Sequence, residues 1–291
     1  MSRIIIGCSN SQNLAKKIAR ELKTQYSALT TKHFPDGELN IRFTAELANK
    51  DIIIVQSMHQ KPNEAMMETI FAIYTARKLG ARKITLVAPY LAYLRQDKMF
   101  HSGECVSNKI IAELLSCADS IITIDPHLHR INKLSEIFTT KTTTLTAMHA
   151  ISKHLIDNKI KGLLVGPDIE SAQWASKVAQ TTGLPFIVLH KKRYTSRTVR
   201  TKVTADVRGK NVIIIDDIIS TGHTMIEPIL QLKKLGAKKI TCIAVHGLFA
   251  ENALTLLRKT GAKILSTNTI QTKASTIDVS STIAEALMRE Q

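Results

Sequence analysis

Short apolar runs alternate with longer segments of helical periodicity along almost the whole chain. The runs are rich in isoleucine and valine and stop at polar or turn residues, which is typical of strands buried on both faces of a parallel sheet. This alternation predicts an α/β protein with mainly parallel sheets flanked by helices. The predicted strands cover residues 4–7, 52–55, 84–88, 121–124, 163–165, 186–189, 212–215 and 240–245, and the predicted helices cover 63–79, 107–115, 172–181 and 224–235.

The chain also repeats itself. Residues 78–85 (KLGARKIT) return as 234–241 (KLGAKKIT), and 50–55 (KDIIIV) return more loosely as 210–215 (KNVIII), at offsets of 234 − 78 = 156 and 210 − 50 = 160. Two matches in one order favour a duplicated domain. The alternative is that helix–glycine–strand junctions converge on similar letters, because glycine commonly ends helices. Duplication predicts two tandem domains, over 1–145 and 146–291, with the last residues able to pack back on the first domain.

Composition narrows the class of protein. The chain has 291 residues, 44% of them hydrophobic, and a mean hydropathy of -0.00, which predicts a globular protein. Lysine plus arginine exceed aspartate plus glutamate by 40 − 24, or 16, which favours phosphate-bearing partners of any kind. The four cysteines form no Cys-x-x-Cys pair, and no apolar run approaches the ~20 residues of a membrane span. We therefore expect a cytoplasmic protein with no membrane partner.

The richest chemistry follows the predicted strand at 212–215. Two carboxylates, Asp216 and Asp217, come first, and the loop 220–224 then opens a predicted helix. Backbone N–H groups at a helix start form an anion nest, and carboxylates can accept bonds from sugar hydroxyls, so the segment suits a sugar phosphate. The alternative is an ordinary helix cap with solvated acids. The first copy has only QSMHQ, residues 56–60, at the matching place, which predicts the main substrate site in the second half.

Further motifs occur in one order: FPDGE at 34–38, RQD at 95–97, DPH at 125–127, PD at 167–168 and KKR at 191–193. Together with the 216–224 segment they resemble the ribose-phosphate diphosphokinases (phosphoribosyl diphosphate synthetases), most closely the shorter archaeal-type branch. The resemblance covers essentially the full chain and implies two tandem duplicated domains of the type I phosphoribosyltransferase fold. One departure is Cys105, which stands where that family often has proline.

The resemblance implies transfer of the diphosphoryl group of ATP to the anomeric hydroxyl of ribose 5-phosphate, with Mg²⁺, in a homodimer or larger homo-oligomer. By the same resemblance, catalysis falls to Lys191 and Arg193 and metal binding to His127 and Asp168. The implied ATP-binding residues are Phe34, Asp36, Glu38, Arg95, Gln96 and Asp97, the first three on the adenine of a neighbouring subunit. The implied ribose 5-phosphate residues are Asp216, Asp217, Ser220, Thr221, Gly222, His223 and Thr224.

Each of these segments also has a simpler interpretation. The sequence at 34–38 is a tight-turn signal that needs no function. Asp168 suits a helix cap, the 191–193 segment suits a solvated basic turn, and a lone histidine such as His127 is more often a hydrogen-bonding structural residue, with His129 as its nearest competitor. Rival functions are a phosphoribosyltransferase and a non-catalytic or nucleic-acid-binding regulator. No recognition-helix, zinc or RNA-binding aromatic signature supports the last, so no nucleic-acid partner is expected.

Overall fold

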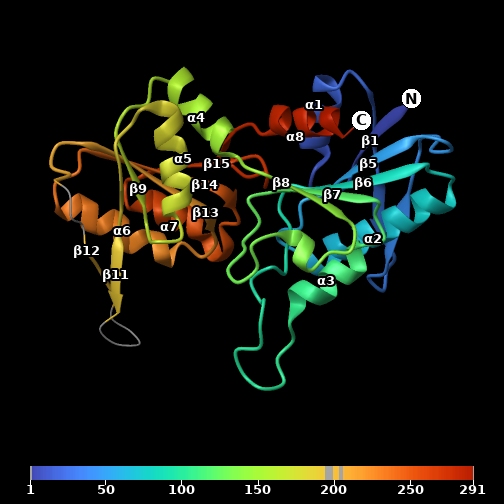
Figure 1. The fold of residues 1–291 in the computed structure, drawn as a ribbon, viewed down its shortest axis with the longest axis horizontal. Coiled ribbons are helices and arrows are strands. Elements are labelled where there is room, and N and C mark those ends of the chain that lie inside the picture. Colours follow the sequence, from blue (N-terminus) through green and yellow to red (C-terminus); the bar gives the residue numbers. More distant parts are fainter. Residues whose placement is uncertain (1, 194–198, 203–205, 291) are drawn as a thin grey trace. The chain divides into compact units, whose positions relative to one another are not determined.

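The computed structural model describes residues 2–193, 199–202 and 206–290, without the side chains of residues 190–205. The chain divides into two compact units (Figure 1). Unit 1 comprises Met1–Thr146 and Ser280–Gln291, and unit 2 comprises Ala147–Val279. The C-terminal helix therefore belongs to unit 1, which is otherwise the first half of the chain.

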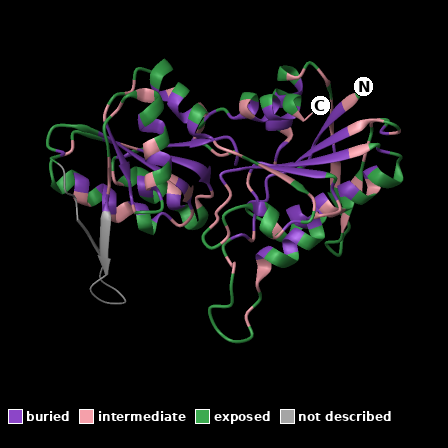
Figure 2. Ribbon diagram, viewed as in Figure 1, coloured by how far each residue is buried: buried purple, intermediate pink, exposed green. Residues whose placement is uncertain are grey.

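Unit 1 is built on a parallel sheet, because each of its strands returns through a crossover before pairing with its neighbour. Its central strands are buried from end to end, which explains their continuous apolar runs (Figure 2). Among the described residues the sheet has six strands, in the order β2 (Gln25–Ala28), β1 (Arg3–Gly7), β5 (Asp51–Val55), β6 (Lys83–Ala88), β7 (Ser120–Ile124) and β8 (Lys141–Leu145).

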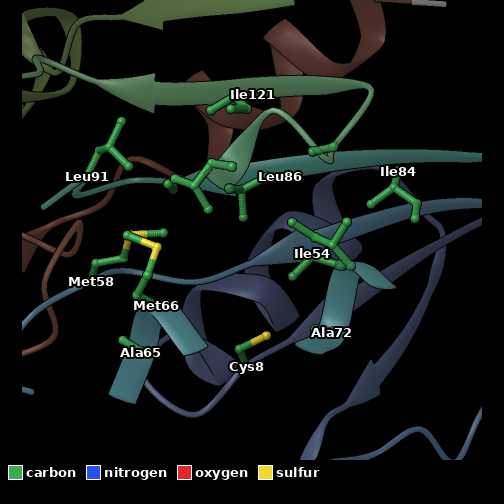
Figure 3. Packing of buried hydrophobic residues seen from close by; sticks show 14 of the residues in the cluster. Cys8, Ile54, Met58, Ala65, Met66, Ala72, Ile84, Leu86, Leu91 and Ile121 are labelled. Carbon is green, nitrogen blue, oxygen red and sulfur yellow. The ribbon is translucent and has the colours of Figure 1, made fainter. Parts of the chain in front are cut away.

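Helices cover both sides of this sheet. Figure 1 shows α1 and α8 on one side and α2 and α3 on the other. Residues from β5, β6 and β7 pack against α2, with Ile54, Leu86 and Met66 fully or almost fully buried (Figure 3). Burial of each such side chain contributes roughly 1.5–3 kcal/mol to folding. The helices are α1 (Gln12–Glu21), α2 (Pro62–Lys78), α3 (Ser107–Leu115) and α8 (Ser280–Arg289), with a 3₁₀ turn, η1 (Leu134–Glu136).

Unit 2 repeats this plan around its own core, which includes Val212, Ile214 and Cys242. Its sheet is also parallel, in the order β10 (Phe186–Val188), β9 (Leu163–Gly166), β13 (Asn211–Ile219), β14 (Lys239–Gly247), β15 (Lys263–Thr267) and β16 (Ser275–Ile277). Its helices are α4 (Met148–Asp157), α5 (Ala172–Thr182), α6 (His223–Lys234) and α7 (Ala253–Lys259), and η2 (Ala250–Asn252) precedes α7. The predicted α/β class with two mainly parallel sheets is confirmed.

Each unit also contains an antiparallel two-stranded hairpin, which follows the second strand of that unit in chain order. In unit 1 it consists of β3 (Thr30–His33) and β4 (Leu39–Arg42), and in unit 2 of β11 (His190–Arg193) and β12 (Val199–Lys202). The predicted adenine residues lie on the first hairpin, and the predicted catalytic pair lies on the second.

Several elements escape the hydrophobic pattern. The strands β2 and β8 lie at sheet edges and contain only exposed and half-buried residues, so they lack the apolar run of a central strand. The 139–144 stretch, which looks like a polar connection, mostly forms β8. Among the helices that the structure describes, none combines the length and apolar character needed to cross a bilayer.

Candidate functional site

The acidic pair lies inside a strand. β13 continues to Ile219, and Asp216 pairs in register with Ala244 of the neighbouring β14. The predicted strand end at residue 215 is therefore wrong, because backbone pairing with β14 continues past the polar side chains. Asp217 is buried, with 6% of its surface exposed. The carboxyl half of β13 thus fixes both carboxylates on a rigid element.

Electrostatic strain is concentrated on Asp216. Burial is the main cause, and repulsion from Asp217 and Asp168 adds to it, so the pKa of Asp216 is raised well above its usual value. The amides of the strand partly compensate: Asp217 N donates to Asp216 Oδ1 at 3.1 Å and Ile218 N donates to Asp217 Oδ1 at 2.7 Å. A cationic or hydroxyl-bearing ligand would relieve this crowding of negative charge.

The loop after β13 forms the start of α6. Gly222 adopts φ +79°, and a Cβ there would lie 3.3 Å from Ala253 and Leu257, so both the backbone and the packing require glycine. The first helical bonds run from Met225 N and Ile226 N to the Gly222 carbonyl, at 2.9 and 3.0 Å. The N–H groups before them have no intrahelical acceptor and point out of the helix start, where they can bind an anion.

Hydroxyl and imidazole groups surround this helix start. The His223 Nδ1 atom lies 3.1 Å from Thr221 Oγ1, and His223 and Thr224 are exposed. Ser220 and Thr221 are half-buried. The structure therefore brings all seven predicted ribose 5-phosphate residues together in one stretch of unit 2, at the carboxyl end of its sheet.

Asp168 lies at the same end of this sheet, in the loop after β9. Its Oδ1 accepts the Ser171 N–H at 3.0 Å, but the N-cap residue of α5 is Ser171 and not Asp168. Its charge also reaches Asp216. Asp168 therefore combines a structural bond with membership of the acidic cluster.

Within the described residues, no group of three or more His, Cys, Asp or Glu side chains is arranged to hold a metal ion without help. The three aspartates nevertheless fit a magnesium ion that takes most of its oxygen ligands from water and substrate, since Mg²⁺ commonly uses only one or two carboxylates together with phosphates.

The predicted catalytic pair falls on β11. Its backbone places Lys191 opposite Thr201 and Arg193 opposite Val199 of β12. The two residues therefore occupy alternate positions of one strand. The side chains of Lys191 and Arg193 themselves lie outside the described residues.

In unit 1 the predicted adenine residues occupy the tip of the β3–β4 hairpin. Gly37 at φ +97° closes the turn, in which Phe34 N donates to the Glu38 carbonyl at 2.8 Å and Glu38 N donates to Asp36 Oδ1 at 3.1 Å. The Phe34 side chain is 49% exposed. An aromatic ring held in the open on a tight turn is available for stacking on a planar ligand.

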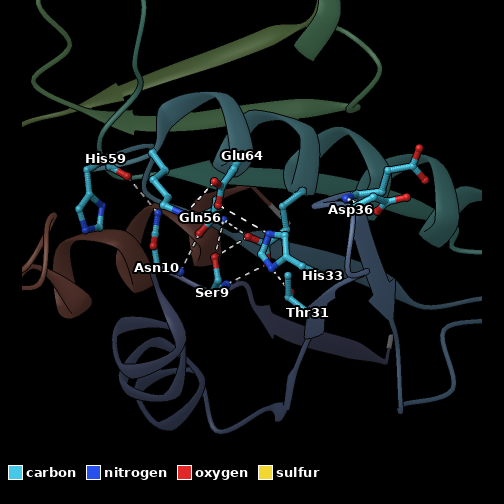
Figure 4. Close-up of polar contacts among 11 residues, drawn as sticks. Ser9, Asn10, Thr31, His33, Asp36, Gln56, His59 and Glu64 are labelled. Carbon is cyan, nitrogen blue, oxygen red and sulfur yellow. Dashed lines mark hydrogen bonds and ion pairs between the residues drawn. The ribbon is translucent and has the colours of Figure 1, made fainter.

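A buried acid that the sequence reasoning missed anchors this hairpin. Glu68 of α2 is 2% exposed and accepts hydrogen bonds from Thr31 Oγ1 at 2.6 Å, Gln56 Nε2 at 2.6 Å and Ser9 N at 3.0 Å, and also from the Ser9 hydroxyl. Figure 4 shows the surrounding polar contacts. In the sequence, the indication of its role was an acidic residue on the core-facing side of a predicted helix. Glu68 ties β3 to the ends of β1 and β5.

The other predicted residues of unit 1 lie in two loops joined by an ion pair. Asp97, whose side chain is 2% exposed, accepts Arg130 Nη1 at 2.7 Å and Arg130 N at 3.1 Å. Arg130 was also missed, and its position three residues after His127 was the only signal. Arg95 is exposed and Gln96 half-buried, in the loop that Asp97 fastens.

His127 follows β7 in the second of these loops. Its ring contacts the His129 ring edge to face, with centroids 4.4 Å apart. The two candidates for the metal-site histidine are therefore neighbours in space as well as in sequence, and the half-buried one is His127.

Comparison with known proteins finds two family domains in the chain. Residues 3–118 match the family described as the N-terminal domain of ribose phosphate pyrophosphokinase, and residues 134–282 match the phosphoribosyl transferase domain. The ribose-phosphate pyrophosphokinase of Methanobrevibacter smithii is 35% identical over 98% of this chain and 99% of its own. That of Methanothermobacter thermautotrophicus is 36% identical with the same coverage. Both relatives are archaeal, as the resemblance predicted.

A solved structure extends the likeness to the fold of the whole chain. The phosphoribosylpyrophosphate synthetase of Mycobacterium smegmatis superposes with a TM-score of 0.84 at 26% identity, covering 100% of both chains. With two family domains covering most of the sequence and relatives above 30% identity over nearly its full length, the chain belongs to the ribose-phosphate pyrophosphokinase family.

Proposed function

We propose that the protein transfers the β,γ-diphosphoryl group of ATP to the anomeric hydroxyl of ribose 5-phosphate. The hydroxyl oxygen forms a bond to the β-phosphorus, the bond from that phosphorus to the bridging oxygen of the α-phosphate breaks, and AMP leaves. The products are 5-phosphoribosyl 1-diphosphate and AMP, and the hydroxyl proton is released. The observation that carries the proposal is the Asp216–Asp217 pair on β13, directly before the open start of α6.

The acceptor sugar fits this arrangement. Amides and hydroxyls of residues 220–224 bind the 5-phosphate, and Asp216 and Asp217 accept hydrogen bonds from the ribose hydroxyls. A phosphate fixed at one end and hydroxyls fixed at the other hold the anomeric carbon in one place. Such positioning is a large part of catalysis in phosphoryl transfer, where the protein contributes little covalent chemistry.

The donor nucleotide fits the two hairpins and the loops of unit 1. Phe34, Asp36 and Glu38 bind the adenine of an ATP held by a neighbouring subunit, which requires a homodimer or larger homo-oligomer. Arg95 and Gln96 contact ATP, and Asp97 holds their loop through Arg130. Lys191 and Arg193 neutralise charge that develops on the transferring phosphoryl groups.

Magnesium is the proposed metal, because its preferred ligands are carboxylate, phosphate and water oxygens. Asp168 and His127 are its proposed protein-side residues, His127 through water rather than by direct bonding, since magnesium prefers oxygen. When bound, the ion supplies charge neutralisation for the diphosphoryl group. Asp168 is already held in place by Ser171.

A phosphoribosyltransferase would need the 216–224 segment but no ATP-binding domain. The match of residues 3–118 to the N-terminal pyrophosphokinase domain favours the diphosphokinase. We place the enzyme in the cytoplasm.

The deciding experiment is ³¹P NMR of the full chain with Mg²⁺, ATP and ribose 5-phosphate. The expected result is formation of AMP and a sugar 1-diphosphate in equal amounts, and no AMP when ribose 5-phosphate is omitted. Release of ADP, or of inorganic phosphate without a sugar diphosphate, would contradict the proposal.

A further inference from the structure

A second cationic site lies at the opposite end of the unit 2 sheet. Residues at the beginnings of β13, β14 and β15 border a cavity of about 250 Å³, far along the strands from the Asp216–Asp217 pair. Its lining includes four lysines, Lys159, Lys161, Lys239 and Lys263, and among the described residues that line it none is acidic. A concentration of like charge in a concave place is unfavourable unless an anion joins it.

The strand registers explain why these lysines converge. Asn211 pairs with Lys239, and Thr241 pairs with Lys263. Paired residues on adjacent parallel strands point to the same face, and so do residues two apart on one strand. Lys239 and Lys263 therefore lie on the same face of two adjacent strands. Lys159 and Lys161 lie in the connection between α4 and β9.

The cationic surface continues beyond this cavity. An adjoining cavity of about 460 Å³ shares Lys161 and Asn211 and adds Lys210. The field of Lys263 also reaches His154 of α4, whose pKa is lowered first by burial and then by this lysine, while Asp157 opposes the shift. Asp157 is itself engaged by Lys153 at 3.1 Å. Among the described residues that line the two cavities, none is an acid that could offset the five lysines.

The first half of the chain shows what an ordinary version of this surface looks like. The same sheet end in unit 1 also borders a cavity, of about 850 Å³, in which Lys83 takes the place of Lys239. There Asp51 stands where unit 2 has Asn211, and Asp119, which precedes β7 and lies outside the cavity lining, stands where unit 2 has Ala262.

Those acids are engaged by cations. Asp51 accepts two bonds from Arg82, at 2.9 and 2.7 Å, and Asp119 accepts Arg77 at 2.9 Å. Glu290, 9% exposed at its side chain, also lines the unit 1 cavity and lies 3.5 Å from Lys141. In unit 2 both corresponding positions are neutral, and Lys263 replaces Ser120. The unit 1 cavity, which residues of α1 and α8 also line, therefore has acids among its described lining residues, and the unit 2 cavity has none.

We propose that the cavity lined by Lys159, Lys161, Lys239 and Lys263 binds a short polyphosphate chain, a ligand with several adjacent phosphoryl groups. Its volume lies just below the roughly 300–1,000 Å³ of pockets for small organic ligands, so the occupant is compact. Among the described lining residues none is aromatic, and stacking platforms are what single-stranded nucleic acids need. The polyphosphate is either inorganic or the tail of a nucleotide.

The test is calorimetry with inorganic tripolyphosphate, using the full chain and a triple variant, Lys161→Gln/Lys239→Gln/Lys263→Gln. The matched control, Lys23→Gln/Lys78→Gln/Lys83→Gln, removes the same charge from the corresponding end of the unit 1 sheet. We expect the cavity variant to bind at least about tenfold more weakly, and the control to stay close to the parent protein. An equal loss in both triple variants, or no loss in the cavity variant, overturns the proposal.

Lysine acetylation mapped by mass spectrometry keeps the test independent of variant folding. Tripolyphosphate should protect Lys161, Lys239 and Lys263, and leave Lys83 reactive. Protection by GTP as well would assign a nucleotide tail, and protection by tripolyphosphate alone an inorganic chain. Protection by a short single-stranded RNA but not by tripolyphosphate would overturn the proposal. Diphosphoryl transfer by the cavity variant without tripolyphosphate should equal that of the parent, so this site and the proposed activity fail separately.

Discussion

The two halves of the chain place their acids differently at the carboxyl ends of matching strands. In unit 1, β5 is followed by neutral Gln56, and the nearby acid, Glu68, sits on the following helix with its oxygens occupied by neutral donors. In unit 2 two acids lie on the strand itself and repel each other. The same fold therefore yields a buried acid held by four hydrogen bonds in one copy and a pair of mutually repelling acids in the other.

The hairpins differ in the same instructive way. The β3–β4 hairpin ends in a tight turn that exposes Phe34, whereas β11 carries three cationic residues, 191–193. An aromatic ring suits a base, and cations suit the phosphates. The two hairpins thus differ in the chemistry that they offer a ligand.

The largest effect should come from the unit 2 hairpin. Lys191→Ala is expected to lower kcat by about 10²-fold or more, because it removes a charge that stabilises the transition state. Lys192→Ala, at the neighbouring position of the same strand, serves as the control and should lower kcat far less. Steady-state rates of AMP formation measure both, and an unchanged kcat in folded Lys191→Ala would remove Lys191 from the mechanism.

The next effect tests the acidic pair against its neutral counterpart. The double change Asp216→Asn/Asp217→Asn should raise KM for ribose 5-phosphate by about tenfold or more, since hydrogen bonds to charged groups contribute about 1.5–3 kcal/mol. ATP binding, followed by calorimetry, should change less. Ser57→Ala at the matching place in unit 1 should leave ribose 5-phosphate use unaltered. Equal weakening of both substrates by the double change would argue against the assignment.

A smaller effect is expected at the anchor of the unit 1 hairpin. Glu68→Gln replaces one carboxylate oxygen, an acceptor, with an NH₂ group, although all four groups bonded to Glu68 are donors. The change should raise KM for ATP several-fold and cost roughly 1–3 kcal/mol of unfolding free energy. KM for ribose 5-phosphate should stay unchanged. Glu64→Gln, on the same helix but half-exposed, is the control. A loss of stability without a change in KM for ATP would leave Glu68 a purely structural residue.

The smallest effect concerns stability and its pH dependence. The pKa of Asp216 is higher in the folded protein than its usual value near 3.8. Between these two pKa values the folded state holds a proton that the unfolded state has lost, so stability falls as the pH rises through this range. Asp216→Asn removes this loss, so the ligand-free variant should melt higher at neutral pH, by roughly 2–4 °C, the shift that about 1 kcal/mol produces at this size. The difference should vanish in acid. A lower melting temperature at neutral pH would contradict the strain.

Much of the fold follows from the sequence because central strands of a parallel sheet are buried on both faces. Runs such as 52–55 and 240–245 can therefore be recognised as strands in the sequence. Edge strands such as β8 are half-exposed and have no such run. The apolar run of β13 is interrupted by Asp216, so the sequence pattern does not show that the strand continues to Ile219. The order of motifs predicts the family correctly.

The candidate site follows less completely. Residues 216–224 are adjacent in sequence, so their grouping can be predicted, whereas Glu68 and Arg130 act through partners 37 and 33 residues away. Such contacts depend on tertiary packing, which neither spacing nor composition encodes. The roles of Lys191, Arg193, His127 and the ATP residues stay predictions.

The central claim is that the acidic strand and helix start of unit 2, and not the matching loop of unit 1, receive the pentose phosphate. A crystal structure of the protein soaked with ribose 5-phosphate tests it directly. The account predicts the phosphorus against the amides of residues 220–224 and the sugar hydroxyls on Asp216 and Asp217. Density for the sugar phosphate at residues 56–60, with the unit 2 loop empty, would contradict it.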